Sequence, residues 1–345
     1  MSYRLPAEWE PQSAVLLTWP HAETDWADFL TEAEQTYREI AVQISRRQTL
    51  ILVCQDEGHH DAVIADLLAQ GANGNNLVVC LAKSDDTWAR DHAALTVFAG
   101  SEPLLLDFQF NGWGGKYPAA KDNAITPTLA QAGLFKQTPL QHLDFTLEGG
   151  AIETDGQGTL LATRSSVLTE SRNPGMTEQA VEQLLTAKLG IDHFLWLDHG
   201  HLSGDDTDGH IDTLARFVDN ESILYVTAYP DDPDYPALRM MRQELETFRT
   251  QAGEPYRLIP LPPITPIFAD DQRRLPASYA NFLIINGAVL LPIYGDKNDT
   301  AAIECLHSCF PEHEIIPIDC RSLIRQNGSL HCITMQFPAG IQFQH

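Results

Sequence analysis

The chain has 345 residues, of which 43% are hydrophobic and 20% are charged, as in ordinary globular proteins. Its 47 acidic and 22 basic residues give a net charge of −25. That charge argues against binding to nucleic acid or an anionic membrane, and it favours a small cationic partner. The N-terminal residues show no basic region followed by an apolar core, so we expect no signal peptide, and no stretch approaches the roughly 20 apolar residues of a membrane span. Six cysteines without C-x-x-C spacing indicate neither a disulfide framework nor a zinc ribbon, so we expect a reduced, cytoplasmic protein.

Short β-rich runs alternate with amphipathic helical patterns along the chain. Strands are predicted at residues 13–19, 49–54 and 77–81, with helices at 28–46 and 59–70 between them. A strand at 159–162, a helix at 177–189, a strand at 223–227 and a helix at 236–252 follow. The C-terminal part contains strands at 282–285, 289–291 and 314–318 and a helix at 299–309. No linker divides this α/β pattern, so we expect one domain over 1–345. The sequence has no glycine-rich phosphate loop that would indicate a nucleotide-binding fold.

A candidate nucleophile lies near the C-terminus, in the segment Asn327-Gly-Ser-Leu-His-Cys332. Cys332 follows a flexible turn and stands beside His331. A thiol reacts as its thiolate, and turns, helix N-termini and neighbouring cations lower its pKa. A buried structural role accounts for the other five cysteines: Cys54, Cys80, Cys305, Cys309 and Cys320. Cys332 is therefore interesting only if the chain also supplies a base and a substrate clamp.

Three polar loops could supply those groups. Residues 85–91 follow a predicted strand, where binding residues often lie. Residues 110–117 combine several glycines with Trp113 and Tyr117, and glycine permits a close approach of backbone to ligand. Glu148 precedes two glycines, as in a bulge or tight turn. Each loop also has a plain alternative: a solvated turn, a surface loop packed on its own aromatic rings, and an exposed carboxylate.

A fourth loop, 204–213, contains His210 and Asp212 two positions apart. On an extended segment they would point to one face and form an acid/base group with a substrate anchor. The density of Asp and His also suggests a metal. However, the loop lacks the closing Glu of a calcium loop, and the chain has no H-E-x-x-H helix. A zinc site would have to recruit His199 and His201, and we expect no metal.

Taken together, these motifs resemble the guanidine-modifying superfamily, which folds as a five-bladed, pseudo-symmetric α/β propeller (the pentein fold) with a central active site. Within it they resemble the agmatine deiminases over nearly the whole chain. The matching motifs are Trp88-x-Arg-Asp91, Trp113-Gly-Gly-Lys-Tyr117, Glu148-Gly-Gly150, Gly209-His-Ile-Asp212 and His331-Cys332. Each is weak alone, but five in the family's order are a strong signal. Two departures exist. His92-Ala-Ala94 replaces the usual x-Gly-Pro, which could alter the loop that shapes the substrate's tail, and Asn327-Gly-Ser329 replaces three glycines without displacing the nucleophile.

The resemblance implies hydrolysis of agmatine to N-carbamoylputrescine and ammonia without cofactor or metal. Cys332 would attack the guanidinium carbon to form a covalent thiouronium intermediate, and Asp91 and Asp212 would clamp the N–H groups. His210 would protonate the departing ammonia and then activate water. Glu148 would orient His210 or a guanidinium nitrogen, and its charge would raise the pKa of the imidazole. Candidates for the substrate's far end are Trp88, Trp113 and Asp206.

Other functions stay open for this superfamily. One is deimination of free or peptidyl arginine, and another is transfer of the amidino group to an amine. A third, non-catalytic alternative is a ribosome-binding anti-association factor. Such a factor would not need the set of Cys, His, Asp and Glu residues that this chain contains. Arginine carries an α-carboxylate that usually requires Arg or Lys in its site, whereas the nearby cations are only Arg90 and Lys116, and both could be structural. We therefore expect a preference for agmatine. The sequence leaves the oligomeric state open, a homo-oligomer included.

Overall fold

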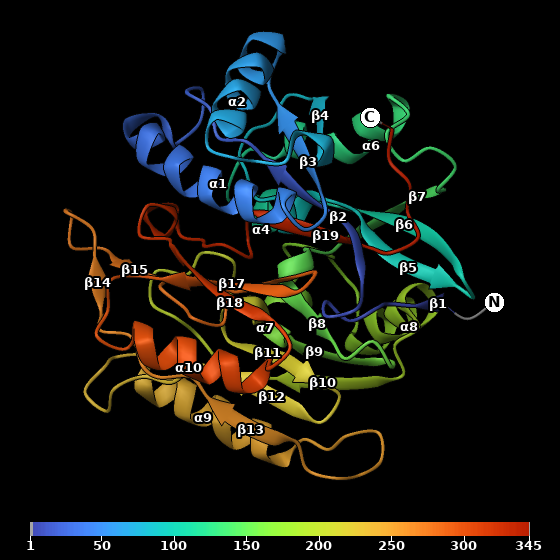
Figure 1. Ribbon diagram of the computed structural model, residues 1–345. Coiled ribbons are helices and arrows are strands. Elements are labelled where there is room, and N and C mark those ends of the chain that lie inside the picture. The colour runs from blue at the N-terminus through green and yellow to red at the C-terminus, as the bar shows by residue number, and fades with distance from the viewer. Residues whose placement is uncertain (1–2, 345) are drawn as a thin grey trace.

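The computed structural model describes residues 3–344 as a mixed α/β fold (Figure 1). Residues 1, 2 and 345 lie outside the described residues. They belong to the expected domain 1–345, and the first two also to the segment searched for a signal peptide. The strands are β1 (Tyr3–Arg4), β2 (Gln12–Thr18), β3 (Thr49–Cys54), β4 (Leu77–Leu81), β5 (Leu95–Ala99), β6 (Glu102–Gln109), β7 (Leu140–Thr146), β8 (Ile152–Thr154), β9 (Thr159–Thr163), β10 (His193–Leu197), β11 (Ala215–Asp219), β12 (Ser222–Tyr225), β13 (Arg257–Pro260), β14 (Ile267–Phe268), β15 (Arg274–Leu275), β16 (Leu283–Ile285), β17 (Ala288–Ile293), β18 (Glu314–Asp319) and β19 (Thr334–Pro338). The helices are α1 (Leu30–Ser45), α2 (Glu57–Ala69), α3 (Ala89–His92), α4 (Gly112–Gly115), α5 (Ala120–Asn123), α6 (Ile125–Gln131), α7 (Arg164–Val167), α8 (Glu178–Leu189), α9 (Tyr235–Thr247) and α10 (Asp299–Cys309).

One pairing pattern recurs through the sheets of the described chain. In each of five sheets, a strand pairs antiparallel with a second strand, which pairs parallel with a third. These triplets are β19-β2-β3, β5-β6-β7, β8-β9-β10, β11-β12-β13 and β16-β17-β18; β4 extends the first of them and β1 the second. In the first sheet the last strand, β19, pairs with the second strand, β2, so segments near the two ends of the chain share one sheet.

Most predicted elements are confirmed, and three are correct to the residue: β3, β4 and α10. The predicted helix 236–252 is too long. It ends at Thr247 because Phe248 has extended backbone, and residues 249–255 then fold back on themselves. Strands β6 and β7 were not predicted, since both mix polar and charged residues with apolar ones, and β6 also contains a proline. Pairing with neighbouring strands, rather than local propensity, accounts for them.

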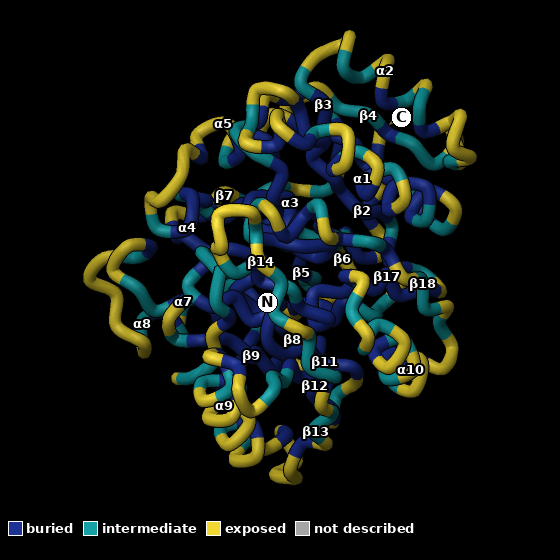
Figure 2. Tube along the Cα trace, turned by 90° about the vertical axis from the view of Figure 1, so that its left-hand side faces the viewer, coloured by how far each residue is buried: buried dark blue, intermediate teal, exposed yellow. Residues whose placement is uncertain are grey.

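The core follows from strands that are buried on both faces. In β2, Val15 and Leu17 point into one hydrophobic cluster, while Ala14 and Leu16 point into a second. Alternate side chains of a strand face opposite sides, so a strand between two apolar layers reads as a continuous hydrophobic run. Figure 2 shows the central strands buried and the helices α2, α8, α9 and α10 exposed on their outer sides. Among the helices of residues 3–344, none is both long and apolar enough to cross a membrane.

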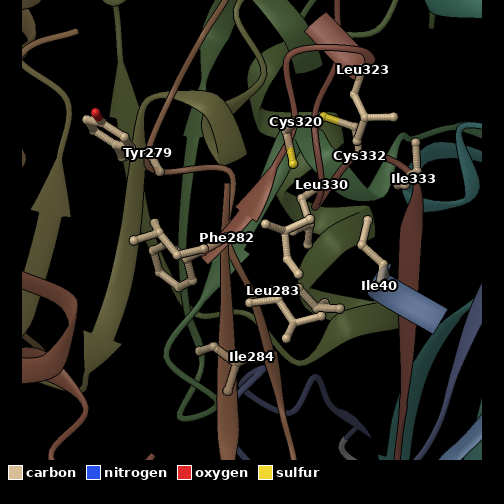
Figure 3. Packing of buried hydrophobic residues seen from close by; sticks show 14 of the residues in the cluster. Ile40, Tyr279, Phe282, Leu283, Ile284, Cys320, Leu323, Leu330, Cys332 and Ile333 are labelled. Carbon is tan, nitrogen blue, oxygen red and sulfur yellow. The ribbon is translucent and has the colours of Figure 1, made fainter. Parts of the chain in front are cut away.

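The larger cluster reaches the segment that carries the candidate nucleophile. Figure 3 shows Phe282, Leu283 and Ile284, from the region of β16, together with Leu330 and Cys332. Leu330 and Ile333 on either side of the His-Cys pair are fully buried. This packing anchors the turn before β19 on the core, so that Cys332 is held in place while its sulfur faces a pocket.

Candidate active site

A pocket of about 500 Å³, counting its open mouth, brings the predicted loops together. Cys332, Asp91 and Asp212 line it, and so do the tail candidates: Trp88, Trp113 and Asp206. Within the described part of the chain, no Lys or Arg lines the pocket. Six aspartates do: Asp25, Asp86, Asp91, Asp205, Asp206 and Asp212. Such a pocket suits a cation and opposes an anion.

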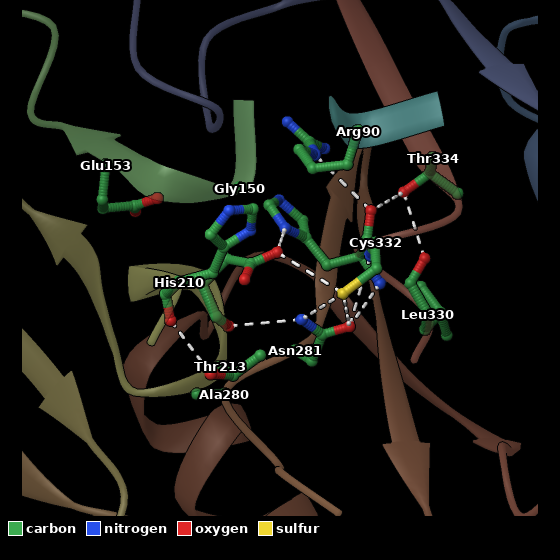
Figure 4. A network of polar contacts seen from close by, with 12 residues as sticks. Arg90, Gly150, Glu153, His210, Thr213, Ala280, Asn281, Leu330, Cys332 and Thr334 are labelled. Atoms are coloured by element: carbon green, nitrogen blue, oxygen red, sulfur yellow. Dashed lines mark hydrogen bonds and ion pairs between the residues drawn. The ribbon is translucent and has the colours of Figure 1, made fainter. Parts of the chain in front are cut away.

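Cys332 lies in a tightly packed turn. Asn327 has left-handed backbone (φ 67°), and a Cβ on Gly328 would lie 2.1 Å from the ring of Trp88. The Cys332 sulfur receives an N–H from Asn281 Nδ2 at 3.2 Å and lies 3.7 Å from Asp212 Oδ2 (Figure 4). Burial raises the pKa of the Cys332 thiol well above its usual value, and the two nearby aspartates add to the rise. Hydrogen bonding to the Ser329 backbone, in the turn, and to Asn281 lowers this pKa but does not offset the rise.

The two predicted clamp carboxylates differ in their environment. Asp91 Oδ1 accepts the Gly150 N–H at 3.0 Å, and Oδ2 accepts the Trp113 indole N–H at 2.9 Å. Burial raises the pKa of Asp91 well above its usual value, and the charge of Asp212 adds to the rise. Burial also opposes ionisation of Asp212, but hydrogen bonding to His331 lowers its pKa. Asp212 Oδ1 has no hydrogen-bond partner among residues 3–344, which leaves one buried acceptor free for a substrate N–H.

His210 lies deeper than the pocket lining. The expectation of an extended segment is wrong, because His210 caps a short 3-10 turn, η4 (Ile211–Thr213), that contains Asp212. Both side chains nevertheless converge on Gly150, where a Cβ would lie 2.7 Å from His210 Nδ1 and 3.2 Å from Asp212 Oδ2. Only glycine fits there. His210 Nδ1 lies 3.6 Å from Asp91 Oδ1, and Nε2 has no hydrogen-bond partner within the described chain.

The expected effect of Glu148 on His210 is wrong. Burial lowers the pKa of His210 to about 3, which outweighs the opposite effect of Asp212. Glu148 is fully buried rather than exposed, and Arg172 Nε donates to both of its oxygens at 2.9 Å. This ion pair neutralises the carboxylate, whose nearest oxygen is 3.9 Å from His210 Nε2. Burial therefore favours the neutral forms of the His210 imidazole and the Cys332 thiol.

Sequence reasoning missed the residues that support the pair His331-Cys332. Asn281 Oδ1 accepts the main-chain N–H of both residues, at 2.9 and 3.3 Å. The His331 ring lies between Asp212 Oδ2 and Glu8 Oε2, each at 2.8 Å. Both ring nitrogens can donate only if the ring is protonated. Glu8 in turn accepts from the buried Arg216 at 2.9 Å. No local motif could have revealed these partners, since Glu8 and His331 are 323 positions apart.

Aromatic rings and carboxylates form the outer part of the pocket. The Trp88 ring lies edge-on to Trp113, 6.4 Å between centroids, and its indole N–H donates to Asp86 Oδ2 at 2.8 Å. Burial raises the pKa of Asp86 to about 6. Asp206 Oδ2 accepts from the Tyr117 hydroxyl at 2.8 Å and from Asn327 at 2.9 Å. Its carboxylate thus has neutral partners only in the described structure.

The remaining candidates lie away from the pocket lining. Arg90 is buried beside Glu8, and Lys116 binds Asp208 at 2.7 Å, so both nearby cations are engaged in the protein. His199 pairs with Glu244 at 2.5 Å, outside the pocket, and His201 is exposed. Among residues 3–344, no three His, Cys, Asp or Glu side chains form a metal-binding group.

The departure at His92-Ala-Ala94 does not reach the pocket. These residues are buried and are absent from its lining. His92 Nε2 shares a hydrogen bond with Thr18 at 3.2 Å, and its ring packs on Phe110. The expected change in the loop around the substrate's tail is therefore not found at these positions.

The site has the parts for attack of a sulfur on a cationic carbon: a nucleophile, flanking carboxylates and a buried imidazole. Comparisons agree with this class. Residues 4–338 match the Porphyromonas-type peptidyl-arginine deiminase family. An agmatine deiminase from Pseudomonas aeruginosa is 31% identical over 98% of this chain and 96% of that protein. A predicted arginine deiminase from Porphyromonas gingivalis is 46% identical in its crystal structure, with a TM-score of 0.92 over 99% of this chain and 100% of that chain. An agmatine deiminase of C. jejuni, solved with substrate bound, is 33% identical, with a TM-score of 0.90 over 99% and 97%.

The chain belongs to the Porphyromonas-type peptidyl-arginine deiminase family. The resemblance to agmatine deiminases that the motifs indicate is confirmed over the full length of the chain.

Proposed function

We propose that the protein hydrolyses agmatine to N-carbamoylputrescine and ammonia. The observation that carries the proposal is a cysteine sulfur in an acidic pocket without Lys or Arg in its described lining, 3.7 Å from an aspartate with one free oxygen. The names of the P. aeruginosa and C. jejuni relatives support this substrate. The family name and the P. gingivalis relative favour arginine instead, free or within a peptide, as the second candidate.

Binding of the cation prepares the nucleophile. Asp91 and Asp212 receive the guanidinium N–H groups. Burial is the main cause of the raised pKa of Cys332, and the positive charge of the substrate offsets the two carboxylates that add to it. The thiol proton passes to His210, whose unpartnered Nε2 is a free acceptor in the described site when the proton is on Nδ1. Preorganised carboxylates also fix the flat guanidinium carbon in front of the sulfur.

Two displacements complete the reaction. In the first, the C–S bond forms, His210 returns its proton to a guanidinium nitrogen, and the C–N bond breaks to release ammonia and leave a thiouronium. In the second, His210 takes a proton from water, the C–O bond forms and the C–S bond breaks. The imidazole then returns its proton to sulfur, and the remaining proton of the new ureido group goes to ammonia. Glu148 contacts the substrate or His210 in this scheme, and no cofactor or metal takes part.

The outer pocket binds the tail. We propose that Asp206 pairs with the terminal ammonium and that Trp88 and Trp113 provide aromatic faces for it. Support comes from the position of all three in the lining and from the neutral partners of the Asp206 carboxylate.

We also propose that the five sheets are blades of a closed five-bladed propeller forming one catalytic domain over 1–345. The recurring pairing pattern supports the blades, and the pairing of β19 with β2 supports closure of the ring by the chain ends. A cytoplasmic location stays a prediction from the sequence.

Incubation with agmatine and with arginine tests the activity. A colorimetric ureido assay and an ammonia assay should show equal amounts of both products from agmatine. Cys332→Ala should be inactive yet folded, whereas the matched Cys54→Ala, also buried but outside the pocket, should keep turnover and lose about 1–3 kcal/mol of stability. Substantial turnover by Cys332→Ala would remove the nucleophile from the mechanism, and no turnover of agmatine by the native protein would refute the proposal.

A further inference from the structure

Arg172 is a buried arginine that belongs to none of the expected motifs. It follows α7, and its side chain is fully shielded from solvent. Its guanidinium contacts two separate parts of the site. Nε donates to both oxygens of Glu148 at 2.9 Å, Nη1 donates to Asp208 Oδ2 at 2.8 Å, and Nη2 donates to the Thr207 carbonyl at 2.9 Å. One planar group thus links Glu148, beside His210, to the segment that follows Asp206.

The segment that Arg172 holds carries the tail carboxylate. Asp206 lies directly before Thr207 and Asp208, and its carboxylate lines the pocket mouth. Asp208 has left-handed backbone (φ 69°), which an L-residue adopts only at a cost unless contacts hold it. Those contacts come from Arg172 and from Lys116 Nζ, at 2.8 and 2.7 Å.

The same segment connects to the imidazole. Thr207 Oγ1 accepts the main-chain N–H of His210 at 3.1 Å. A shift of residues 206–208 would therefore move both the tail carboxylate and the base of the site. Lysine could not replace this arrangement, because a single ammonium lacks the planar fork that reaches three acceptors in fixed directions.

We propose that Arg172 is a positioning residue that sets the distance between the guanidinium-binding end and the ammonium-binding end of the pocket, and so selects the length of the substrate. The inference rests on the proposed function. The enzyme would bind a guanidine and an amine at a fixed separation. Arg172 ties Glu148, which lies 3.9 Å from His210, to residues 207 and 208, which follow Asp206, in one rigid frame.

A series of ω-aminoalkylguanidines with three, four and five methylene groups tests the inference. The measured quantity is the ratio of kcat/KM for the four-carbon compound, agmatine, to that for each neighbour. In Arg172→Lys this ratio should fall about tenfold, because either end of the site can then relax toward the wrong length. Asp208→Asn, which keeps the contact of Arg172 with Glu148, should also lower the ratio and should raise KM more than it lowers kcat.

Arg164→Lys is the matched control. Arg164 lies eight positions earlier, makes ion pairs with Glu178 and Asp198 at the surface, and is outside the pocket lining. The substitution should leave the length ratio unchanged. Folding of each variant is checked by circular dichroism and thermal unfolding. If Arg172→Lys does not fold, the ratio in Asp208→Asn decides.

A native protein that is inert toward agmatine would overturn the proposed function and this inference with it. A native protein that turns agmatine over, with a folded Arg172→Lys or Asp208→Asn that loses activity equally on all three compounds, would overturn the length-selecting role alone. A lower ratio in the same variants supports it, since a purely structural role would scale the three rates together.

Discussion

Discrimination against arginine is the most direct consequence of the pocket. Arginine adds one carboxylate to the agmatine skeleton, at the end that the outer pocket receives. That end contains Asp86 and Asp206, neither of which has a charged hydrogen-bond partner in the described structure, and no cation of the described chain lines the wall. The added anion would meet negative charge and lose water without gaining a partner.

The magnitude follows from two terms. At an effective dielectric constant near 20, two unit charges 4 Å apart interact by about 4 kcal/mol, and the open mouth reduces that repulsion to about 1–2 kcal/mol. Leaving a carboxylate without hydrogen bonds in a partly buried site costs about 1–3 kcal/mol more. The sum of about 3 kcal/mol corresponds to a kcat/KM for arginine at least about a hundredfold below that for agmatine.

The assay compares agmatine, arginine, butylguanidine and a peptide with C-terminal arginine at equal ionic strength. Butylguanidine, which lacks the terminal ammonium, should fall between the first two. Added salt should narrow its difference from agmatine, because the net charge of −25 attracts a dication more strongly than a monocation. Equal or better use of arginine or of the peptide would refute the reasoning, and butylguanidine as efficient as agmatine would show that the tail charge is not recognised.

Three further predictions concern the clamp, metals and pH. Asp91→Asn and Asp212→Asn should each lower kcat/KM by at least about a hundredfold, roughly 3 kcal/mol of transition-state positioning, and near-native efficiency of either variant would show that it is not part of the clamp. EDTA should leave the activity unchanged, and inhibition that zinc reverses would contradict metal-free chemistry. Burial raises the pKa of Asp122 to about 7, so the folded protein binds this proton more tightly than the unfolded chain, whose Asp pKa is about 3.9. The stability that this proton contributes is therefore present below about pH 4 and lost as the pH rises through 7. Between pH 5 and pH 8 the free energy of unfolding of Asp122→Asn in urea should rise by about 2–3 kcal/mol relative to that of the native protein. A difference between the two proteins that does not change with pH would contradict the assignment.

The sequence alone determined the α/β class, most of the elements and the predicted residues that line the pocket. A strand such as β3 is read correctly because an apolar run bounded by turn residues indicates burial on both faces. The motifs around Asp91, His210 and Cys332 are local, so their residue types and spacing can be recognised without knowledge of the fold.

Only the tertiary structure decided how those groups are charged and held. Burial is a property of the whole packed chain, and it favours the neutral forms of the Cys332 thiol and the His210 imidazole, contrary to what their neighbours in the sequence suggest. The partners that position the site come from distant segments: Arg172 neutralises Glu148, and Glu8 holds His331 across 323 residues. A lone Arg or Glu carries no local signal of such a partner, since the distance between two side chains is set by the packing of sheets and loops that no short motif contains.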